Sequence, residues 1–440
     1  MTGAWRGLAE RLGPAPLLAV TGRVSRIVGL LAEARGLRAA VGERCTIARR
    51  AGGPLAAEVV GFREGGLLLM PLGDLAGVAP GDRVAAGGHP ARVRVGPELL
   101  GRVLGPLGQP LDGRPAPRGG ERLPFLRPAP PAMARHRIAA PLPTGVRAID
   151  ALLTCGRGQR LGIFAGSGVG KSTLLGMIAR ATSADVNVIG LIGERGREVQ
   201  EFLQGALGAE GLGRSVVVVA TSDLPPLLRR QAAFLATTVA EHFRDQGRSV
   251  MLMLDSLTRF AMAQREVGLA AGEPPTTRGY PPSAFALLPQ LLERAGPGQG
   301  PGAITGLYTV LVEGDDMNEP VADAARAILD GHVVLSRALA DRGHYPPVDV
   351  LASVSRLMPH VATAAQQRAA ARVREALGAL RAVEDLVRIG AYVAGSDPAV
   401  DDALARLPRI EALLRQAPGE RARFEDTLRA LEEIWSDAAR

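Results

Sequence analysis

The sequence of 440 residues is too long for one hydrophobic core and predicts two to four domains. Its two cysteines, Cys45 and Cys155, exclude a disulfide scaffold and a four-thiolate zinc site, and its net charge of +8 is modest over this length. No apolar run reaches the roughly 18 to 20 residues that span a bilayer, and no signal-peptide pattern is present, so we expect a cytoplasmic protein.

The first 20 residues carry Trp5, Leu8 and Leu12 at helical spacing. They form either an amphipathic segment that docks on a partner or a membrane surface, or a frayed chain end. From residue 21 to about 93, short apolar runs alternate with Gly, Pro and Asp, as at 57–62 and 67–70. Short strands with regular turn signals predict a small β-barrel domain over 21–93.

A connector rich in Pro and Gly, with little periodicity, follows at 106–143. Apolar runs at 161–164, 186–192, 216–220 and 250–254 then lack polar alternation, which is typical of parallel strands buried on both faces. Helical patterns lie between these runs, for example at 173–181 and 227–245. We therefore predict an α/β domain with a mainly parallel sheet over 94–360, which the family resemblance described below implies to be RecA-like.

After residue 361 the sequence is rich in Ala, Leu, Arg and Glu, and apolar residues recur every three or four positions. Val373, Leu377 and Leu380 belong to one such stripe, which Gly390 should end. Pro408 is expected to begin a second helix, and residues 424–435 carry the stripe of a last one. These patterns predict a C-terminal α-helical domain over 361–440.

The loop after the first run of the α/β domain contains the only lysine of the sequence, Lys171. It lies between a predicted strand and a predicted helix and reads Gly166-Ser167-Gly168-Val169-Gly170-Lys171-Ser172-Thr173. This matches the phosphate-binding P-loop pattern, with Ala165 in place of the first glycine; an accidental Gly-rich turn is the alternative. Backbone N–H groups and the helix N-terminus can hold phosphates there, and the lysine reaches the terminal ones. We expect these eight residues to bind ATP, with the Ser172 hydroxyl on Mg²⁺.

Two acidic residues end predicted buried strands. Asp255 follows the run at 250–254, and an aspartate beside a P-loop can hold Mg²⁺ through its water shell. Glu194 ends the strand that begins at 186, where a carboxylate can orient the water that attacks the γ-phosphate. The alternatives are a turn or cap role for Asp255 and a surface ion pair of Glu194 with Arg195 or Arg197.

Four motifs resemble the catalytic subunits of rotary ATP synthases and their export relatives: PTGVRAID at 143–150, GERGREV at 193–199, LDSLTR at 254–259 and SVSR at 353–356. The segments at 164–172, 261–266 and 390–398 are similar to type III export ATPases. Within that group the flagellar branch is favoured and the injectisome branch comes next. The resemblance extends from about residue 22 to the C-terminus.

The resemblance implies roles for individual residues. The catalytic glutamate of the family falls on Glu194, and its magnesium-side aspartate falls on Asp255. Its arginine finger, supplied by the neighbouring subunit, falls on Arg356, and the aromatic residue that stacks on adenine falls on Tyr345. Arg195 is also expected to face the γ-phosphate. An arginine that acts on a neighbour works only when subunits pack in a ring, so the resemblance implies a homohexamer.

The implied function is Mg²⁺-dependent ATP hydrolysis that energises flagellar type III protein export. The resemblance implies a cytoplasmic protein, peripheral at the inner face of the membrane, that releases chaperone–substrate complexes and feeds unfolded substrates to export-gate membrane proteins. Residues 1–20 weakly resemble the family's contact for a regulatory stator-like protein.

Four other functions stay open. They are an injectisome ATPase, a proton-coupled ATP synthase subunit, a nucleotide-binding ring subunit without catalysis, and a hexameric RNA translocase. The water-positioning carboxylate at Glu194 argues against a non-catalytic subunit. Aromatic residues make up only 3% of the chain, which offers few stacking platforms, so we expect no nucleic-acid partner.

Overall fold

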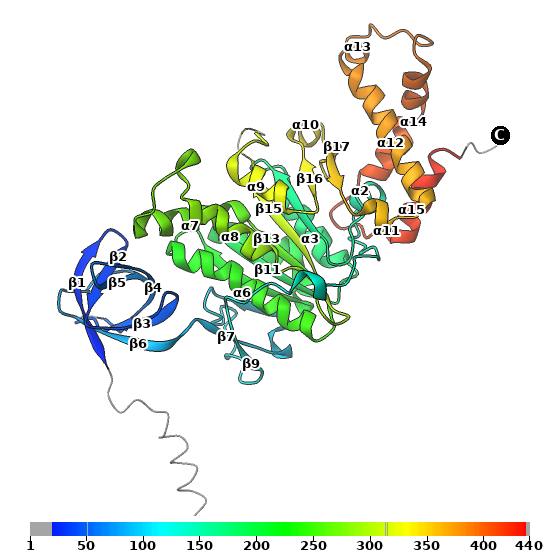
Figure 1. Cartoon of the computed structure of the whole chain (residues 1–440). Helices are drawn as coiled ribbons and strands as arrows, with labels where there is room; N and C mark the ends of the chain where they lie inside the picture. The colour runs from blue at the N-terminus through cyan, green and yellow to red at the C-terminus, as the bar shows by residue number, and fades with distance from the viewer. Residues whose placement is uncertain (1–19, 51, 313, 315, 437–440) are drawn as a thin grey trace, which may run out of the picture. The chain divides into compact units, whose positions relative to one another are not determined.

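The computed structural model describes residues 20–50, 52–312, 314 and 316–436 (Figure 1). The chain divides into two compact units: the first comprises Met1–Ala91 and Val267–Glu273, and the second comprises Arg92–Glu266 and Pro274–Arg440. The expected partner-binding segment 1–20 lies, apart from Val20, outside the described residues, so its role stays a prediction. Within the described part of the chain, no helix is long and apolar enough to cross a bilayer.

The first unit contains a closed, antiparallel six-stranded barrel in the order β1-β2-β5-β4-β3-β6. Its interior is filled by alternating side chains such as Val24, Ala34, Ile47 and Leu69, each 2% exposed or less. The predicted β-barrel is thereby confirmed. The strands are β1 (Thr21–Val28), β2 (Leu31–Arg35), β3 (Glu43–Ile47), β4 (Leu55–Arg63), β5 (Gly66–Pro71) and β6 (Arg83–Pro90).

The second unit is built on a nine-stranded sheet whose main path runs β17-β16-β10-β15-β13-β11-β12-β8, with β14 paired to β15. Its strands are β8 (Arg102–Leu104), β10 (Arg160–Ala165), β11 (Val186–Glu194), β12 (Ser215–Thr221), β13 (Ser249–Asp255), β14 (Gly296–Pro297), β15 (Ala303–Leu311), β16 (Gly331–Leu335) and β17 (Val348–Ser355). All pairs are parallel except β14–β15 and β16–β17. The mainly parallel sheet confirms the predicted α/β class.

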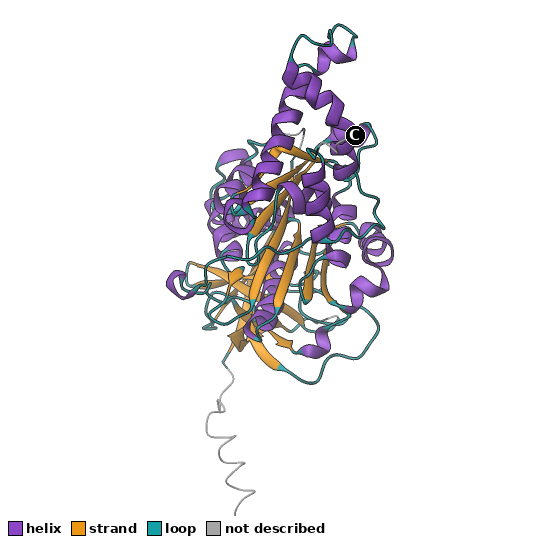
Figure 2. Cartoon of the chain, turned by 90° about the vertical axis from the view of Figure 1, so that its right-hand side faces the viewer, coloured by secondary structure: helices purple, strands orange, loops and turns teal. Residues whose placement is uncertain are grey.

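Helices lie on both sides of this sheet (Figure 2). The helices before the C-terminal region are α2 (Arg147–Leu152), α3 (Lys171–Ala181), α4 (Gly196–Glu201), α5 (Gly208–Gly213), α6 (Pro226–Asp245), α7 (Leu257–Ala271), α8 (Pro282–Leu292), α9 (Pro320–Ile328) and α10 (Arg337–Asp341). Helix α6 packs along β11, β12 and β13, whereas α3 packs with α5. Covering both faces buries every residue of strands such as β13, which explains the uninterrupted apolar run at 250–254.

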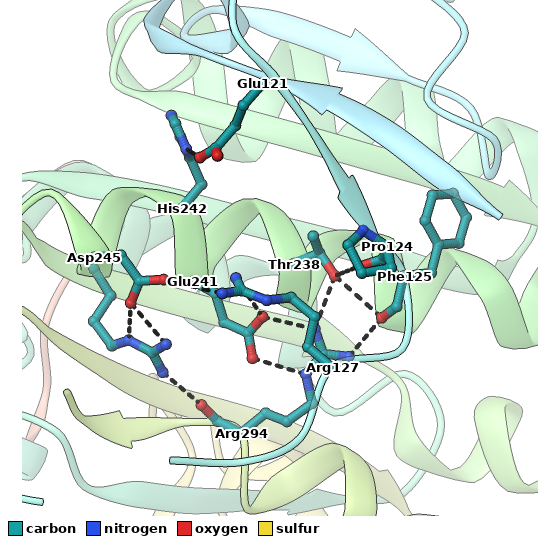
Figure 3. Close-up of polar contacts among 10 residues, drawn as sticks. Glu121, Pro124, Phe125, Arg127, Thr238, Glu241, His242, Asp245 and Arg294 are labelled. Atoms are coloured by element: carbon teal, nitrogen blue, oxygen red, sulfur yellow. Dashed lines mark hydrogen bonds and ion pairs between the residues drawn. The ribbon is translucent and has the colours of Figure 1, made fainter. Parts of the chain in front are cut away.

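The region expected to be a connector of little periodicity contains a strand, β9 (Glu121–Pro124), which pairs antiparallel with β7 (Arg92–Val95). The chain that follows is tied to α6 by Arg294, which is 1% exposed and donates two hydrogen bonds of 2.8 Å to the Glu241 carboxylate (Figure 3). The same guanidinium donates to the Phe125 carbonyl at 2.7 Å and to Thr238 Oγ1 at 2.8 Å. Arg127 donates to the same carboxylate at 3.2 Å. All three guanidinium nitrogens of Arg294 and both carboxylate oxygens of Glu241 therefore take part in hydrogen bonds. A buried charge pair needs such partners to offset the loss of water.

The C-terminal region is helical, as predicted, with α11 (Met358–Val361), α12 (Ala364–Ala382), α13 (Glu384–Arg388), α14 (Pro398–Leu414) and α15 (Phe424–Glu433). Helices α12 and α14 pack together, and α15 packs on α2. The expectation that Pro408 begins a helix is wrong: α14 begins at Pro398, after the Asp397 side chain caps its first turn, and Pro408 lies inside it. Both prolines are compatible with a helix start, but only Pro398 follows a capping residue.

Candidate active site

The P-loop connects β10 to α3, as the sequence predicts. Gly168 and Gly170 have positive φ angles of 77° and 95°, in the left-handed region that favours glycine. Helix α3 begins at Lys171 directly after this turn, and no side chain caps its first N–H groups. Those free N–H groups and the positive end of the helix dipole leave the loop suited to bind an anion.

The carboxyl ends of β11 and β13 bring two acidic side chains to the lysine of the loop. Lys171 Nζ lies 3.4 Å from Glu194 Oε1 and makes a short contact with Asp255 Oδ1. Parallel strands end at one edge of the sheet, which is why residues separated by 23 and 84 positions meet here. The structure therefore brings together three of the residues that the sequence singled out.

The Asp255 carboxylate is held in place by a residue that sequence reasoning missed. Its side chain is 3% exposed, and Thr309 Oγ1 on β15 donates to Asp255 Oδ1 at 2.7 Å. A threonine within an apolar strand carries no local signal for such a role. Only the pairing of β13 with β15 places the two residues side by side.

Burial and charge change the proton affinities of this cluster. Burial, followed by the negative charge of Asp255, raises the pKa of Glu194 to about 7, although Lys171 opposes the shift. Burial alone would lower the pKa of Lys171, but the two carboxylates outweigh it and raise that pKa. The lysine is thus a stable cation, whereas the glutamate titrates near neutral pH.

The residues expected to hold Mg²⁺ offer suitable oxygen donors. Ser172 is exposed in the first turn of α3, and its hydroxyl makes no hydrogen bond to another residue that the structure describes. Asp255 supplies a carboxylate. Mg²⁺ prefers such oxygen ligands and usually keeps several waters while binding substrate phosphates. Accordingly, no group of three or more acidic, histidine or cysteine side chains that could enclose a metal occurs in the described part of the chain.

Tyr345 lies beside the P-loop, in the connection between β16 and β17. Its ring carbon Cε1 is 3.9 Å from the position that a Cβ atom would take at Gly170, and the residue is 48% exposed. Its carbonyl accepts a hydrogen bond of 2.9 Å from the backbone N–H of Gln416. A half-exposed aromatic ring next to a phosphate-binding loop can stack on a nucleotide base.

A second residue that sequence reasoning missed is Arg337, the first residue of α10. Its Nη2 atom donates to the carbonyl of Ser167 at 2.8 Å, so this guanidinium holds the P-loop from the side of β16. Nothing in the local pattern distinguishes it from the many other arginines of the chain. The contact depends on the neighbouring positions of β10 and β16 in the sheet.

The two other arginines singled out from the sequence lie away from the lysine. The Arg195 side chain is 75% exposed and forms an ion pair with Glu198 at 3.2 Å. Arg356 follows Ser355, the last residue of β17, which pairs with Gly331 at the start of β16. The P-loop follows Ala165, the last residue of β10, which pairs with Leu335 at the end of β16. Four residues of strand separate these levels, or about 13 Å. Arg356 therefore does not reach the P-loop of its own chain.

Comparison with known proteins identifies the family. The nucleotide-binding domain of the ATP synthase alpha/beta family matches residues 145–355, and the T3SS EscN ATPase C-terminal domain matches residues 362–433. The flagellum-specific ATP synthase of Bacillus subtilis (strain 168) is 52% identical over 415 residues, which cover 94% of each chain. The chain belongs to the ATP synthase alpha/beta family. Within it, the chain is a P-loop ATPase of the flagellar and type III secretion branch.

This ATPase is also similar to injectisome proteins. The type 3 secretion system ATPase of Xanthomonas euvesicatoria is 51% identical over 418 residues, covering 95% of this chain and 94% of that protein. Among solved structures, assembled EscN from the enteropathogenic E. coli type III secretion system matches with a TM-score of 0.88 and 45% identity, over 94% of this chain and 99% of that chain. EscN in complex with its central stalk EscO matches with a TM-score of 0.87 and 44% identity over the same shares of the chains.

Proposed function

We propose that this ATPase energises flagellar type III protein export by Mg²⁺-dependent hydrolysis of ATP at the P-loop. The observation that carries the proposal is the meeting of Lys171, Glu194 and Asp255 at one edge of the sheet. The identity of 52% to the flagellar protein of Bacillus subtilis supports the flagellar assignment.

When nucleotide binds, the phosphates replace the carboxylates of Glu194 and Asp255 as the partners of Lys171. Its ammonium group, now paired with two carboxylates, turns to the β- and γ-phosphates, which are held by the backbone of Gly166–Thr173. Asp255 and the Ser172 hydroxyl are then free to hold Mg²⁺, directly or through its waters. Held by these residues, Mg²⁺ would supply positive charge that offsets the charge of the phosphate oxygens. Tyr345 stacks on the adenine beside the loop.

Glu194 orients the attacking water and accepts its proton. Its pKa of about 7 lies close to the pH at which a general base works best. We propose that Arg195, which is exposed next to this residue, turns toward the γ-phosphate. Arg356 lies at the opposite end of the strands from the P-loop of its own chain. We propose that it completes the site of a neighbouring subunit in a homohexameric ring.

Partners follow from the same assignment. EscN assembles and binds a central stalk, which supports a ring and a stalk-like partner for this chain. We further propose that the chain works at the cytoplasmic face of the membrane with export-gate proteins and chaperone–substrate complexes, and that residues 1–20 bind a stator-like regulator. An injectisome role is the second candidate, because a type 3 secretion system ATPase is 51% identical.

The experiment combines turnover with complementation. ATP hydrolysis by the purified protein is measured with and without Mg²⁺, and the gene is expressed in a motile bacterium that lacks its own flagellar export ATPase. We expect Mg²⁺-dependent turnover and restored swimming, whereas Glu194→Gln should keep only a small residual rate and should not restore swimming. Restored injectisome secretion without restored swimming would favour the second candidate. Turnover that requires single-stranded RNA would overturn the export function altogether.

A further inference from the structure

A cavity of about 390 Å³ lies between the edge of the sheet and the C-terminal helices, away from the P-loop. Its walls come from α10, the start of β17, α12, α13 and α14. Most of the lining is apolar, with Leu339, Val350, Leu377 and Leu407 on its different sides. This volume and this lining fall in the range of sites that bind small organic molecules.

One polar side chain in the lining can bind a ligand directly. His344 is 6% exposed, and its ring makes no hydrogen bond to any residue that the structure describes. Burial, with the nearby positive charges of Arg415 and Arg342, lowers the pKa of this histidine, which favours the neutral ring. Its ring nitrogens are not among the fully buried polar atoms that lack a partner, so they reach the solvent of the cavity, and a hydrogen-bonding ligand can take the place of that water.

Positive charge at the rim is available to a ligand. Arg342 pairs with Glu384 at 2.8 Å, and Arg415 pairs with Glu411 at 3.5 Å. All four side chains are at least 43% exposed, so solvent screens each pair and another anion can replace the glutamate. The same two guanidinium groups act electrostatically on His344. The polar end of the cavity thus combines one neutral hydrogen-bonding ring with two exchangeable cations.

The cavity is joined to the nucleotide site by short covalent and hydrogen-bonded links. His344 directly precedes Tyr345, and Arg415 directly precedes Gln416, whose N–H group binds the Tyr345 carbonyl at 2.9 Å. Helix α10, which forms one wall, begins with Arg337, the residue that holds the P-loop at Ser167. A molecule that fills the cavity therefore stabilises the positions of both the aromatic ring and the arginine.

We propose that this cavity binds a small amphiphilic carboxylate, with its apolar body between α12 and α14 and its carboxylate at His344, Arg342 and Arg415, and that its occupancy strengthens nucleotide binding. The two effects are reciprocal, so that nucleotide also strengthens binding of the carboxylate. The cavity site stands on its own residues, whereas the coupling rests on the proposed roles of Tyr345 and the P-loop.

The probe for the experiment is 2-naphthoate, an aromatic carboxylate of suitable shape, titrated calorimetrically into the full-length protein. Leu407→Trp fills the cavity, and His344→Phe removes the hydrogen-bonding ring with little change in volume. Leu386→Trp, at an exposed leucine of α13 outside the cavity, is the matched control. Thermal unfolding of each variant verifies its fold. The two cavity variants test different features, since Leu407→Trp reduces the volume of the cavity and His344→Phe removes its hydrogen-bonding nitrogens.

We expect saturable binding of one naphthoate per chain, weakened at least tenfold by either cavity variant and unchanged by the control. Uncharged 2-naphthamide should bind more weakly than the carboxylate. Absence of saturable binding, or equal binding by Leu407→Trp, would overturn the site. With Mg²⁺ and ADP present, the affinity for naphthoate should rise at least threefold. An unchanged affinity would overturn the coupling and leave the site itself standing, whereas loss of ATP binding in all proteins would instead contradict the proposed function.

Discussion

Lys171 Nζ lies 3.4 Å from Glu194 Oε1, although Lys171 begins α3 and Glu194 ends β11. The same ammonium group contacts Asp255, so one cation stands between two buried or half-buried carboxylates. Under the proposed function, a triphosphate replaces the carboxylates as the partner of this cation. The lysine then serves both the charge balance of the site and nucleotide binding, which substitution can test.

Lys171→Ala should abolish turnover and weaken ATP binding at least a hundredfold. Two carboxylates are then left close together without a cation, and removing one member of a buried ionic group costs about 3–5 kcal/mol. Binding is measured with a fluorescent ATP analogue, and Arg429→Ala, at an exposed arginine paired only with Asp426 in the described residues, is the control. Unchanged affinity in Lys171→Ala would refute the assignment of the P-loop.

The pH dependence of kcat/KM should report the Glu194 carboxyl of the free protein. Its pKa is raised to about 7, and the ionised form is the one that accepts a proton, so kcat/KM should fall as the pH drops through about 7. Glu194→Gln should show a residual rate roughly 10²–10⁴ times lower, without this inflection. The same inflection in the glutamine variant would assign the titration to another group.

Arg356→Ala should reduce the activity of assembled rings far more than that of dilute monomers. Arg356 lies about 13 Å from the level of the P-loop of its own chain, so the proposed role requires the P-loop of a neighbouring subunit. An arginine supplied by a neighbour contributes roughly 10³–10⁵ to phosphoryl transfer in related systems. The measurement is ATPase activity against protein concentration, and an equal loss at every concentration would contradict the role between subunits.

Arg337→Met should raise the KM for ATP about threefold to tenfold and change kcat less. The variant loses the hydrogen bond from a charged group to the Ser167 carbonyl, a contact of about 1.5–3 kcal/mol at most, while the P-loop itself is kept. Arg337→Lys should restore part of the affinity, which a purely structural role would not predict. Arg429→Met is the matched control.

Glu241→Gln should destabilise the second unit by about 3–5 kcal/mol, because it leaves the buried Arg294 guanidinium without its anionic partner. Asp245→Asn, one turn further along α6 and 46% exposed, should cost no more than about 1 kcal/mol. Both values come from urea unfolding followed by circular dichroism. Similar losses in the free energy of unfolding for the two variants would show that the buried pair stabilises the protein no more than the exposed one.

Much of the site could be predicted because its signals are local. The glycines and the lysine of the P-loop lie within eight consecutive residues, and Glu194 and Asp255 each end an apolar run. Strand ends of a parallel sheet meet at one edge, which explains why the structure brings Glu194 and Asp255 to the same lysine. The helix beginning at Pro398 was missed, because Pro408 satisfies the same local rule and only the Asp397 cap distinguishes them.

The amino-acid sequence by itself determined the class of the fold and the chemistry of the phosphate-binding loop, since both depend on short-range periodicity and on residue type. The tertiary structure alone decided that Thr309 donates a hydrogen bond to Asp255 and that Arg337 donates one to the P-loop. It also decided that His344 lines a cavity. These contacts join residues that are 54 or more positions apart or lie on different elements. Strand order and helix packing set such distances, and no local pattern encodes them.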